Sequence, residues 1–531
     1  MKKRTAARSM AALMGAAMVL TACGGGNTTA PTTGASSGGE TQTASESAES
    51  GKITKTDIVV GQASDIVTLD PAGQQDTTSG VLMKHAYSTL LDVDNEGKVV
   101  PDLAESYEMK SDTEYVFKLR EDACFWDGTP VTAQDVKFSL DRAKGMPKTK
   151  SNTSKIEEVT VNGDHEVTIK LTEPYAAFKT IVTQHNLSIL SEKAVTEAGD
   201  SYGDVDNLLG SGPFKVTEWV PNDHYTLVRN DNYWGEMPIA TSITCRVIPE
   251  GSARTIALEA GEIDVVWSVD PTDCANVESN PDVKLLSQPS TGIDYVGMNT
   301  QKEKFSDKRV RQAINYALDK QAFVDTIIEG RGLVANSYIN AAIPGWTDEV
   351  EAYPYDPEKA KELLAEAGYP DGFECSIFVN GDLRTRSAQI LQAQLADVGI
   401  KVDISTYEWG ALLDTLNAGE HEMFLLGWSN TSFDPDGSTY QLFYSGNHGA
   451  TGNRAFFSND KVDELILSAQ RESEESKRME LYKELQFVLH EESPWCPLYY
   501  KENNVGVRSD LKGFTLHAGA QHYLGNCHYE E

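Results

Sequence analysis

The sequence predicts a multidomain protein of mixed class, with α/β and α+β parts. Helical and strand-like hydrophobic patterns alternate along the chain, and no internal repeat period relates them. The chain has 531 residues, which exceeds the roughly 250–300 residues at which a single hydrophobic core stops growing. Some strand patterns are paired across short turns, whereas others follow an amphipathic helix. These observations together favour several domains that contain both helices and sheets.

The first residues have the pattern of a secretory signal peptide. Basic side chains near the N-terminus precede an apolar run from Met10 to Leu20, which is too short to span a bilayer. The sequence Leu20-Thr21-Ala22-Cys23 resembles the signal of a bacterial lipoprotein, in which the cysteine is acylated and becomes the new N-terminus. An ordinary signal peptide with a cysteine at its cleavage site is the alternative. We therefore expect a signal peptide over residues 1–22 and lipidation at Cys23.

The stretch after Cys23 is predicted to be a flexible tether. Residues 24–52 consist almost entirely of Gly, Ser, Thr, Ala and acidic residues. Such a composition cannot bury a core and behaves as a flexible spacer. We expect the tether to cover residues 23–53 and to hold the protein at the outer face of the cytoplasmic membrane. The protein would then be anchored by its lipid and would not span the membrane.

Charge and cysteine content restrict the partners of the chain. The formal net charge is −34 and the sequence pI is about 4.6. Such a surface repels nucleic acid and anionic lipid, so neither is an expected partner. The cysteines after Cys23 are widely spaced, with no Cys-x-x-Cys, which argues against a zinc site. A disulfide between Cys496 and Cys527 is one hypothesis, and free buried thiols are the alternative.

Short strands and helices are predicted in the first part of the chain. The expected strands cover residues 57–63, 115–119, 159–161 and 167–171, and a helix is expected over 81–91. Residues 162–164 form the predicted turn of a hairpin. Thr132 is expected to cap a helix that runs through Leu140.

Helical patterns become more frequent in the second part. The expected helices cover residues 308–320, 357–367, 387–398 and, as two helices, 461–491, with a strand over 400–404. The second of these begins after Asp356-Pro357, and Gly368 is expected to end it. Asp307 and Arg311 are four residues apart, and we expect a surface salt bridge between them.

The chain lacks the spacings of the common catalytic motifs. It contains no Gly-x-Ser-x-Gly, no His-Glu-x-x-His and no phosphate-binding loop. We therefore predict no catalytic residue, no enzymatic activity and no cofactor. His517, His522, Cys527 and His528 form a loose cluster without a recurring metal spacing. A solvated C-terminal segment is favoured there over metal binding, and no metal ligand is predicted.

Several ordered blocks of sequence resemble one known family. They include Thr68-Leu69-Asp70-Pro71-Ala72, Val100-Pro101-Asp102-Leu103-Ala104, Phe125-Trp126-Asp127-Gly128-Thr129-Pro130, Gly210-Ser211-Gly212-Pro213-Phe214, Ala367-Gly368-Tyr369-Pro370 and Gly427-Trp428. These blocks keep their order and spacing from about residue 54 to 531. The chain in this respect resembles the extracytoplasmic solute-binding protein of peptide-type ABC importers, the dipeptide- and oligopeptide-binding family. Trp126 is expected to pack in the core rather than to contact a ligand.

The resemblance implies a two-lobed, periplasmic-binding-protein-like fold with a hinge and an accessory domain. Mapped by matching segments, lobe one covers 54–91, 191–290 and 498–531, the accessory domain covers 92–190, and lobe two covers 291–497. The hinge is expected near 290–292 and 496–498. The lobes are expected to close because a bound ligand contacts both of them.

The resemblance also implies where the ligand binds. The residues expected to contact it are Gln75, Asp76, Thr77, Thr78, Tyr295, Asn299, Asn380, Arg384, Trp409, Trp428, Ser429, Asn430, Thr431, Asp434 and Asp436. Trp409 and Trp428 have core packing as an equal alternative, and Asn430 has the role of a turn former.

One position departs from the pattern of the family. Peptide binders carry an aspartate three residues after the Gly-Trp tryptophan, where it holds the ammonium group of the ligand, and this chain has Thr431. Asp434 and Asp436 are the candidate replacements for that anchor. Arg384 and Arg386 are the nearest candidates to bind a ligand carboxylate.

These predictions lead to a specific functional hypothesis. We expect a monomeric, lipid-anchored receptor that captures a small peptide and delivers it to an ABC permease with its ATPase subunits. A binder of another solute is the first alternative, since relatives carry glutathione-like peptides, opines, sugars, haem and nickel complexes. A surface hydrolase is the second alternative, and no motif supports it.

Overall fold

The computed structural model describes residues 52–531. Residues from Gly51 to Glu531 form one compact unit. The predicted signal peptide, Cys23 and most of the predicted tether lie outside the described residues. Within residues 52–531, no helix combines the length and the apolar character needed to cross a membrane.

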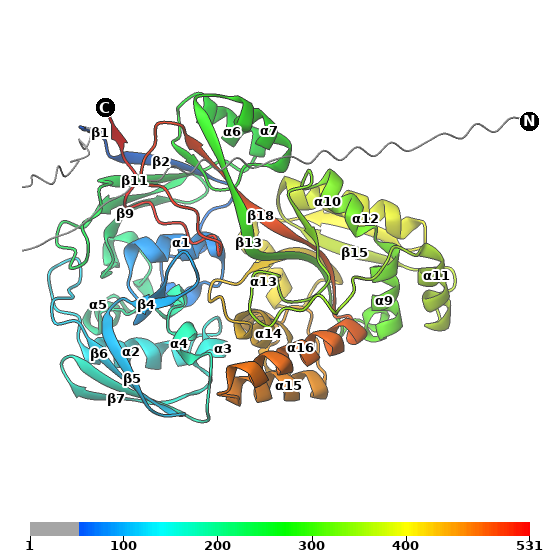
Figure 1. Ribbon diagram of the computed structural model, residues 1–531, viewed down its shortest axis with the longest axis horizontal. Coiled ribbons are helices and arrows are strands. Elements are labelled where there is room, and N and C mark those ends of the chain that lie inside the picture. Colours follow the sequence, from blue (N-terminus) through cyan, green and yellow to red (C-terminus); the bar gives the residue numbers. More distant parts are fainter. Residues whose placement is uncertain (1–51) are drawn as a thin grey trace, which may run out of the picture. The chain divides into compact units, whose positions relative to one another are not determined.

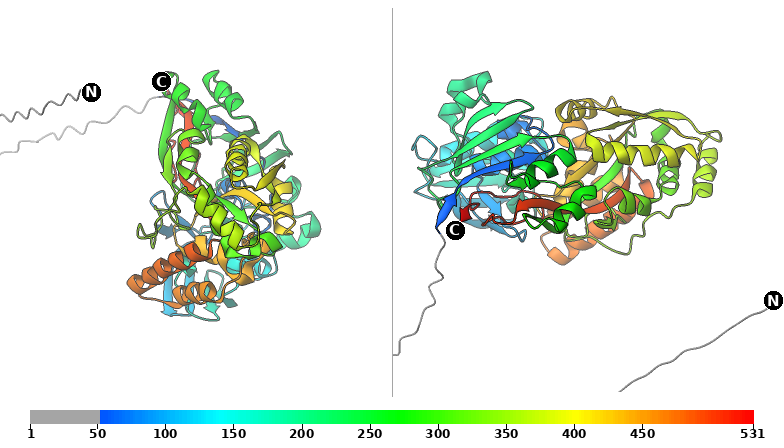
Figure 2. Two further views of the ribbon diagram at one scale, coloured as in Figure 1. Left: turned by 90° about the vertical axis from the view of Figure 1, so that its right-hand side faces the viewer. Right: turned by 90° about the horizontal axis from the view of Figure 1, so that it is seen from above.

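A large mixed sheet organises this unit. Its strand order is β16-β15-β17-β13-β18-β12-β2-β11-β10-β9, and β14 also pairs with β18. The two long strands β13 (Val283–Met298) and β18 (Trp495–Arg508) run antiparallel side by side and join the two halves of the sheet (Figure 1). Figure 2 shows β18, in red, passing from one half into the other. The pairing of β13 with β18 is irregular between Pro289 and Ile293, where the first hinge segment is predicted.

The first sheet half contains β12, β2, β11, β10 and β9. Its elements are β2 (Asp57–Gln62), α1 (Thr77–Ala86), β9 (Phe214–Val220), β10 (His224–Arg229), β11 (Ser242–Val247), α6 (Gly251–Glu259), β12 (Val265–Val266) and α7 (Cys274–Ser279). β2 is parallel to both β11 and β12. Its alternating residues Ile58 and Val60 are buried in a core shared with α1 and the C-terminal segment.

The second sheet half contains β15, β16 and β17. Its elements are α8 (Glu303–Ser306), α9 (Lys308–Ala317), α10 (Lys320–Thr326), β14 (Gly332–Val334), α11 (Pro357–Glu366), β15 (Glu374–Val379), α12 (Gly381–Ala396), β16 (Lys401–Thr406), α13 (Trp409–Asn417), β17 (Met423–Ser429), α14 (Asp436–Phe443), α15 (Asp460–Arg471) and α16 (Glu475–Glu492). Two clusters of buried residues, one around Ile314 and Leu391 and one around Phe424 and Trp495, form its core.

A separate four-stranded antiparallel sheet has the order β5-β6-β8-β7. The elements of this region are β3 (Leu91–Val93), β4 (Val99–Pro101), β5 (Ala104–Ser111), β6 (Glu114–Leu119), α2 (Ala133–Lys144), α3 (Lys150–Thr153), β7 (Ile156–Gly163), β8 (Glu166–Leu171), α4 (Phe178–Ile181) and α5 (Glu192–Ala198). The region has its own core, in which Phe117, Leu140 and Ile169 are buried. At the edge of the unit, β1 (Ile53–Lys55) pairs with β19 (Tyr529–Glu530). The predicted domain boundaries stay predictions.

Local capping signals set the helix limits that matter for the cavity. Thr132 caps α2 in a capping box with Asp135, as predicted. Gly368 follows the end of α11 with φ of 94°, a conformation that glycine adopts without strain. The helix expected over 81–91 instead begins at Thr77 and ends at Ala86, because the Asp76 side chain accepts a hydrogen bond from Ser79 N.

The block Gly210-Ser211-Gly212-Pro213 passes directly against the end of α1. A Cβ at Gly210 would lie 2.1 Å from Ala86 O, and one at Gly212 would lie 2.5 Å from the carbonyl carbon of the same residue. Trp126, which is 6% exposed, donates from Nε1 to Gly212 O at 3.2 Å. Only glycine permits this close approach, so the motif positions α1.

Two local predictions are corrected. Asp307 caps α9 and pairs with Arg309, whereas Arg311 is buried and donates to backbone carbonyls, among them Phe305 O at 2.8 Å. A buried guanidinium needs several acceptors, and the carbonyls supply them. All cysteines within residues 52–531 are free, so the Cys496–Cys527 disulfide is not formed.

Candidate functional site

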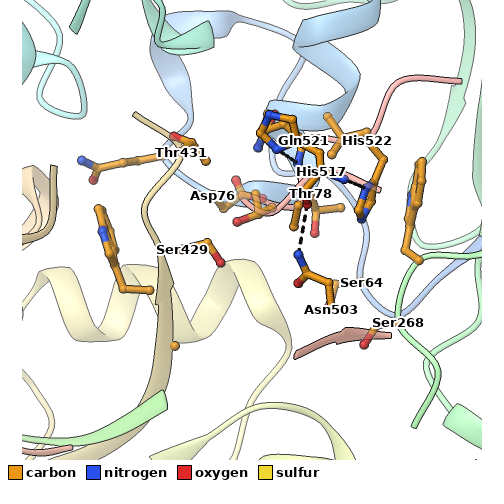
Figure 3. Close-up of a pocket in the computed structure, with 18 of the residues that line it drawn as sticks. Ser64, Asp76, Thr78, Ser268, Ser429, Thr431, Asn503, His517, Gln521 and His522 are labelled. Atoms are coloured by element: carbon orange, nitrogen blue, oxygen red, sulfur yellow. Dashed lines mark hydrogen bonds between the residues drawn. The ribbon is translucent and has the colours of Figure 1, made fainter. Parts of the chain in front are cut away.

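A cavity of about 410 Å³ lies between the two sheet halves. Its walls come from the start of α1, the 183–186 segment, α12, α13, the loop after β17, β18 and the C-terminal residues 517–522. In Figure 3, Asp76 and Thr78 from α1 lie close to His517 and Gln521, whereas Ser429 and Thr431 enter from another ribbon. Segments that are far apart in the sequence therefore form one site.

The structure brings many of the expected ligand-binding residues together at this cavity. The expected residues that line it are Gln75, Asp76, Thr77, Thr78, Asn380, Arg384, Trp409, Trp428, Ser429 and Thr431. Asn430 borders a smaller hollow of about 20 Å³ that shares several of these neighbours. Contact with a solute remains a proposal for all of them.

Asp76 contributes a carboxylate to the wall formed by α1. Its Oδ1 accepts from Ser79 N at 2.9 Å, which caps the helix. Its Oδ2 is buried and has no hydrogen-bond partner among the described residues. Burial raises the pKa of Asp76, while the bonds from Ser79, the nearby charge of Lys148 and the indole of Trp409 act in the opposite direction. An ionised Asp76 would be stabilised by a cationic group placed in the cavity.

Two glutamines next to Asp76 add further acceptors. Gln75 Nε2 donates weakly to Gln441 Oε1 at 3.4 Å, while Gln75 Oε1 is buried without a partner. Gln521 packs on α1, since a Cβ at Gly80 would lie 3.1 Å from Gln521 Nε2. Its Oε1 is also buried without a partner. This wall therefore presents acceptors whose donors are missing.

The opposite wall carries two guanidinium groups. Arg454 is 6% exposed, and its only hydrogen bond from the side chain within the described residues runs from Nε to Asn417 Oδ1 at 3.0 Å. Burial lowers its pKa, which Tyr295 and Asp76 partly oppose. Arg384 stands 5.9 Å over the ring of Trp409, and its Nε has no partner.

The other cations of the lining already have carboxylate partners. Lys501 pairs with the buried Asp294 at 2.9 Å. Lys84 pairs with Asp92 at 2.9 Å, and Arg331 pairs with Glu278 at 2.7 Å. Arg384 also approaches Asp294, but at 3.8 Å. Within the part of the chain that the structure describes, Arg454 is the lining cation without a carboxylate within 4.0 Å.

Two of the three histidines of the loose C-terminal cluster, His517 and His522, line the same cavity and are buried, which corrects the expected solvated segment. His517 Nδ1 accepts from Gly519 N at 3.1 Å, and His522 Nδ1 accepts from His517 N at 3.1 Å. Burial lowers the pKa of His517 to about 4 and that of His522 to about 3. Both rings are therefore neutral at pH 7. No three His, Cys, Asp or Glu residues between 52 and 531 are arranged to hold a metal ion.

Tyr295 and Asn299 do not line the cavity, and their expected role is corrected. Tyr295 is 1% exposed and stacks on Trp495 with a centroid distance of 3.5 Å. Asn299 lies at the end of β13, where Nδ2 donates to Gly419 O and His421 O at 3.2 Å. The C-terminal half of β13 is buried on both faces, so the Tyr295 and Asn299 side chains pack in the core.

Asp434 and Asp436 are also corrected as candidate anchors, because the protein already pairs them. Asp434 forms a bidentate salt bridge with Arg478, which is 3% exposed. Asp436 accepts from Tyr175 Oη at 2.6 Å and from Gln470 Nε2 at 2.9 Å. Burial, together with Asp434, raises the pKa of Asp436 to about 6.

The loop after β17 has mostly structural hydrogen bonds. Asn430 is 1% exposed and donates to Asp434 O at 2.7 Å, which is the expected turn-forming role. Trp428 Nε1 donates to Gly437 O in the first turn of α14 at 3.0 Å. Thr431 Oγ1 donates to Gln184 Oε1 at 2.8 Å. The Thr431 hydroxyl therefore supplies no charge to the cavity.

Sequence reasoning missed part of the lining. Arg454, Lys501, Asn503, Gln184 and Gln521 come from loops and from β18, and no motif marks them. For Arg454 the sequence shows only a position before the apolar run Ala455-Phe456-Phe457, which does not indicate a binding role. The histidine pair was noticed, but its place at the cavity was not predicted.

The fold and the cavity define the class of the protein. Two sheet halves joined by a pair of crossing strands enclose a polar cavity, as in two-lobed solute-binding receptors. Residues 98–450 match the model of the bacterial extracellular solute-binding proteins, family 5 Middle. The chain belongs to this family, whose members bind solutes for ABC importers.

Individual relatives agree with this membership. The chain is 32% identical over 479 residues to the glutathione-binding protein GsiB of Escherichia coli (strain K12), covering 87% of this chain and 92% of that protein. The periplasmic binding protein DppA from Helicobacter pylori, in complex with the peptide STSA, has a TM-score of 0.86 at 28% identity, with 90% and 99% covered. The oligopeptide-binding protein AppA from Bacillus subtilis, in complex with a nonapeptide, has a TM-score of 0.83 at 26% identity, with 90% and 100% covered.

Proposed function

We propose that this chain is the receptor of an ABC importer for a small peptide with free charged ends. The observation that carries the proposal is the cavity between the sheet halves, which holds an unpaired guanidinium at Arg454 and an unpaired carboxylate oxygen at Asp76. Buried charged groups without partners are rare unless a ligand completes them. A peptide supplies both complements at once.

The size of the cavity supports a short peptide. Its volume of about 410 Å³ falls in the range of roughly 300–1,000 Å³ that small-molecule sites have. Among the similar proteins, glutathione-binding GsiB and DppA with the peptide STSA match this size, whereas AppA was solved with a nonapeptide, so the cavity volume decides. We therefore favour solutes of two to four residues over long peptides.

Contacts between the sheet halves support a mechanism in which closure encloses the solute. Arg386 of α12 pairs with Asp270 of the first half at 2.7 Å, and Arg331 pairs with Glu278 across the same boundary. A ligand that touches both walls favours the closed arrangement, because only that arrangement offers all of its contacts. The irregular pairing at residues 290–292 is the proposed hinge.

The delivery step is proposed to depend on the N-terminus. Acylation at Cys23 and a flexible tether over residues 23–53 would keep the receptor close to its permease and raise its local concentration there. Mass spectrometry of the N-terminal peptide from membranes tests this part. An unmodified cysteine, or a mature chain that begins after it, would contradict the anchor.

Isothermal titration calorimetry tests the proposed ligand class. The protein would be the chain from residue 24 onward, which retains the whole compact unit Gly51–Glu531. The titrants are glutathione, trialanine and a panel of di- to hexapeptides. We expect saturable binding of at least one short peptide at one site per chain. Absence of heat and of any melting shift with the whole panel would reject a peptide as the solute.

A further inference from the structure

The loop after Trp428 offers no free carboxylate to the cavity. Thr431 stands there, and its hydroxyl is already bonded to Gln184. The two acids that follow are also unavailable, because Arg478 neutralises Asp434 while Tyr175 and Gln470 bond Asp436. A solute with a free amino group must therefore find its counterion elsewhere in the lining.

Asp76 meets the requirements for that counterion. Its Oδ1 is used as the cap of α1, which fixes the side chain, and its Oδ2 is buried without a partner. Gln75 Oε1 and Gln521 Oε1 are buried acceptors without donors in the same wall. An ammonium group has three donors and no acceptor, so one carboxylate and two amide oxygens complement it.

The rival carboxylate in the lining is Glu502. It has no salt bridge within the described residues, but neither of its oxygens is among the buried atoms that lack a partner. Glu502 can therefore remain hydrated when the cavity is empty, whereas Asp76 Oδ2 cannot. Of the two, Asp76 gains more from a ligand cation.

The complementary group lies on the other sheet half. Arg454 is more than nine-tenths buried and keeps both of its terminal nitrogens free of protein acceptors. A guanidinium of this kind matches a carboxylate in a bidentate pair. The Nε bond to Asn417 holds the group in position, as Ser79 holds Asp76.

We propose that Asp76 binds the ammonium group of the solute and Arg454 its carboxylate, so that the solute bridges the two sheet halves by its charges. This inference rests on the proposed function and adds to it the residues that determine specificity. The proposed residue that binds the ammonium group is therefore Asp76 at the start of α1, in place of the acids in the loop after Trp428. A solute with either end blocked loses its charged contact with one sheet half. Its binding then no longer favours the closed arrangement.

A paired set of variants and ligands tests the assignment. Titrations use glutathione and trialanine, each also in an N-acetylated and a carboxyl-amidated form, with wild type, Asp76→Asn and Arg454→Gln. Asparagine is a good helix cap, so Asp76→Asn is expected to keep α1 and the melting temperature. Asp403→Asn, an exposed carboxylate on β16 that does not line the cavity, is the control for a change of net charge.

We expect each protein variant to lose as much affinity as the ligand whose corresponding end is blocked. Asp76→Asn should weaken binding of the free peptide by about tenfold or more, as for a charge-assisted hydrogen bond. N-acetylation should weaken wild-type binding similarly, and Asp76→Asn should then add little. Arg454→Gln and carboxyl amidation should form a second such pair, while Asp403→Asn should bind as wild type.

Other outcomes overturn the inference in distinguishable ways. If wild type binds a peptide but Asp76→Asn and N-acetylation leave the affinity unchanged, the ammonium assignment is rejected and the proposed function stands. If Glu502→Gln abolishes binding and Asp76→Asn does not, Glu502 is the anchor instead. If wild type binds no peptide of the panel, the proposed function fails and this inference fails with it. Amidation and acetylation do not touch the protein fold, so they keep the test decisive even where a variant unfolds.

Discussion

At the scale of single residues, the surroundings of a carboxylate decide its role. Asp434 and Asp436 follow the Gly-Trp block closely, and both are committed to protein partners. Asp76 caps a helix and would pass for a purely structural residue, yet one of its oxygens is left without a donor. A carboxylate oxygen without a hydrogen-bond donor, rather than a sequence motif, indicates which residue is available to a ligand.

Replacing Asp434 by alanine should destabilise the fold. The change leaves the guanidinium of Arg478, which is 3% exposed, without its bidentate partner. Breaking a buried pair from one side costs about 3–5 kcal/mol. Urea unfolding followed by circular dichroism measures the loss.

The matched control is Asp403→Ala on β16, where the side chain is exposed. A surface change of this kind stays within about 0.5 kcal/mol. Equal stability of the two variants would contradict the account of Asp434 and reopen it as a ligand anchor.

The sequence predicted some site residues and missed others for physical reasons. The predicted residues that line the cavity include Asp76, Arg384 and Trp409. Each lies close in sequence to a segment that could be matched to the family. Tyr295 was expected there because the family resemblance implied it, but the side of a strand that faces a cavity depends on register and on the neighbouring sheet. Arg454 was missed because its role comes from contacts between distant segments.

At the scale of elements, glycine-rich blocks position the helix that carries Asp76. The Gly210–Gly212 segment lies against the end of α1, with Ala86 O in the way of any side chain. Periodicity and caps predicted the strands β2, β6, β7, β8 and β16 and the helices α1, α2, α9, α11, α12, α15 and α16, but not the other elements. The long pair β13 and β18 was not predicted, because its pairing is non-local and leaves no pattern in either segment.

Changing Gly210 to alanine should destabilise the protein through overpacking. The new Cβ would lie 2.1 Å from Ala86 O and 2.5 Å from the ring of Trp126, so α1 or the tryptophan must shift. Such insertions cost about 1–3 kcal/mol. Thermal and urea unfolding measure the change.

Gly410→Ala on α13 is the control, because a Cβ there has no atom within 4 Å and the position is helical. Its stability should equal or slightly exceed that of wild type. If Gly210→Ala is as stable as this control, the proposed close approach of the two segments is wrong.

At the scale of the whole molecule, buried histidines predict loss of stability in acid. Burial lowers the pKa of His85, His421 and His517 to about 4 and the pKa of His185 and His522 to about 3. Between these values and about 6.5 the unfolded chain binds protons that the folded chain does not. Stability should therefore be full above pH 6.5 and decline as the pH falls toward 4.

Carboxyls whose pKa is raised by burial act in the opposite direction; Asp76 and Asp273 are among them, and two others shift furthest. Burial raises the pKa of Asp102 to about 7 and, with Asp434, that of Asp436 to about 6. Their folded forms bind protons more tightly, so acidification from pH 7 toward 4 relieves a penalty. Five histidines outweigh these acids, and urea midpoints at pH 7.5 and 5 should show a net fall. A midpoint that is unchanged or higher at pH 5 would contradict the burial of the histidines.

The central claim is that a short peptide lies between the two sheet halves with its charges on opposite walls. A crystal structure of the chain with the tightest peptide of the panel tests it most directly. The account predicts the peptide in the cavity of about 410 Å³, with its ammonium on Asp76 and its carboxylate on Arg454. A peptide bound elsewhere, or bound in the cavity with its ammonium held by the loop after Trp428, would contradict it.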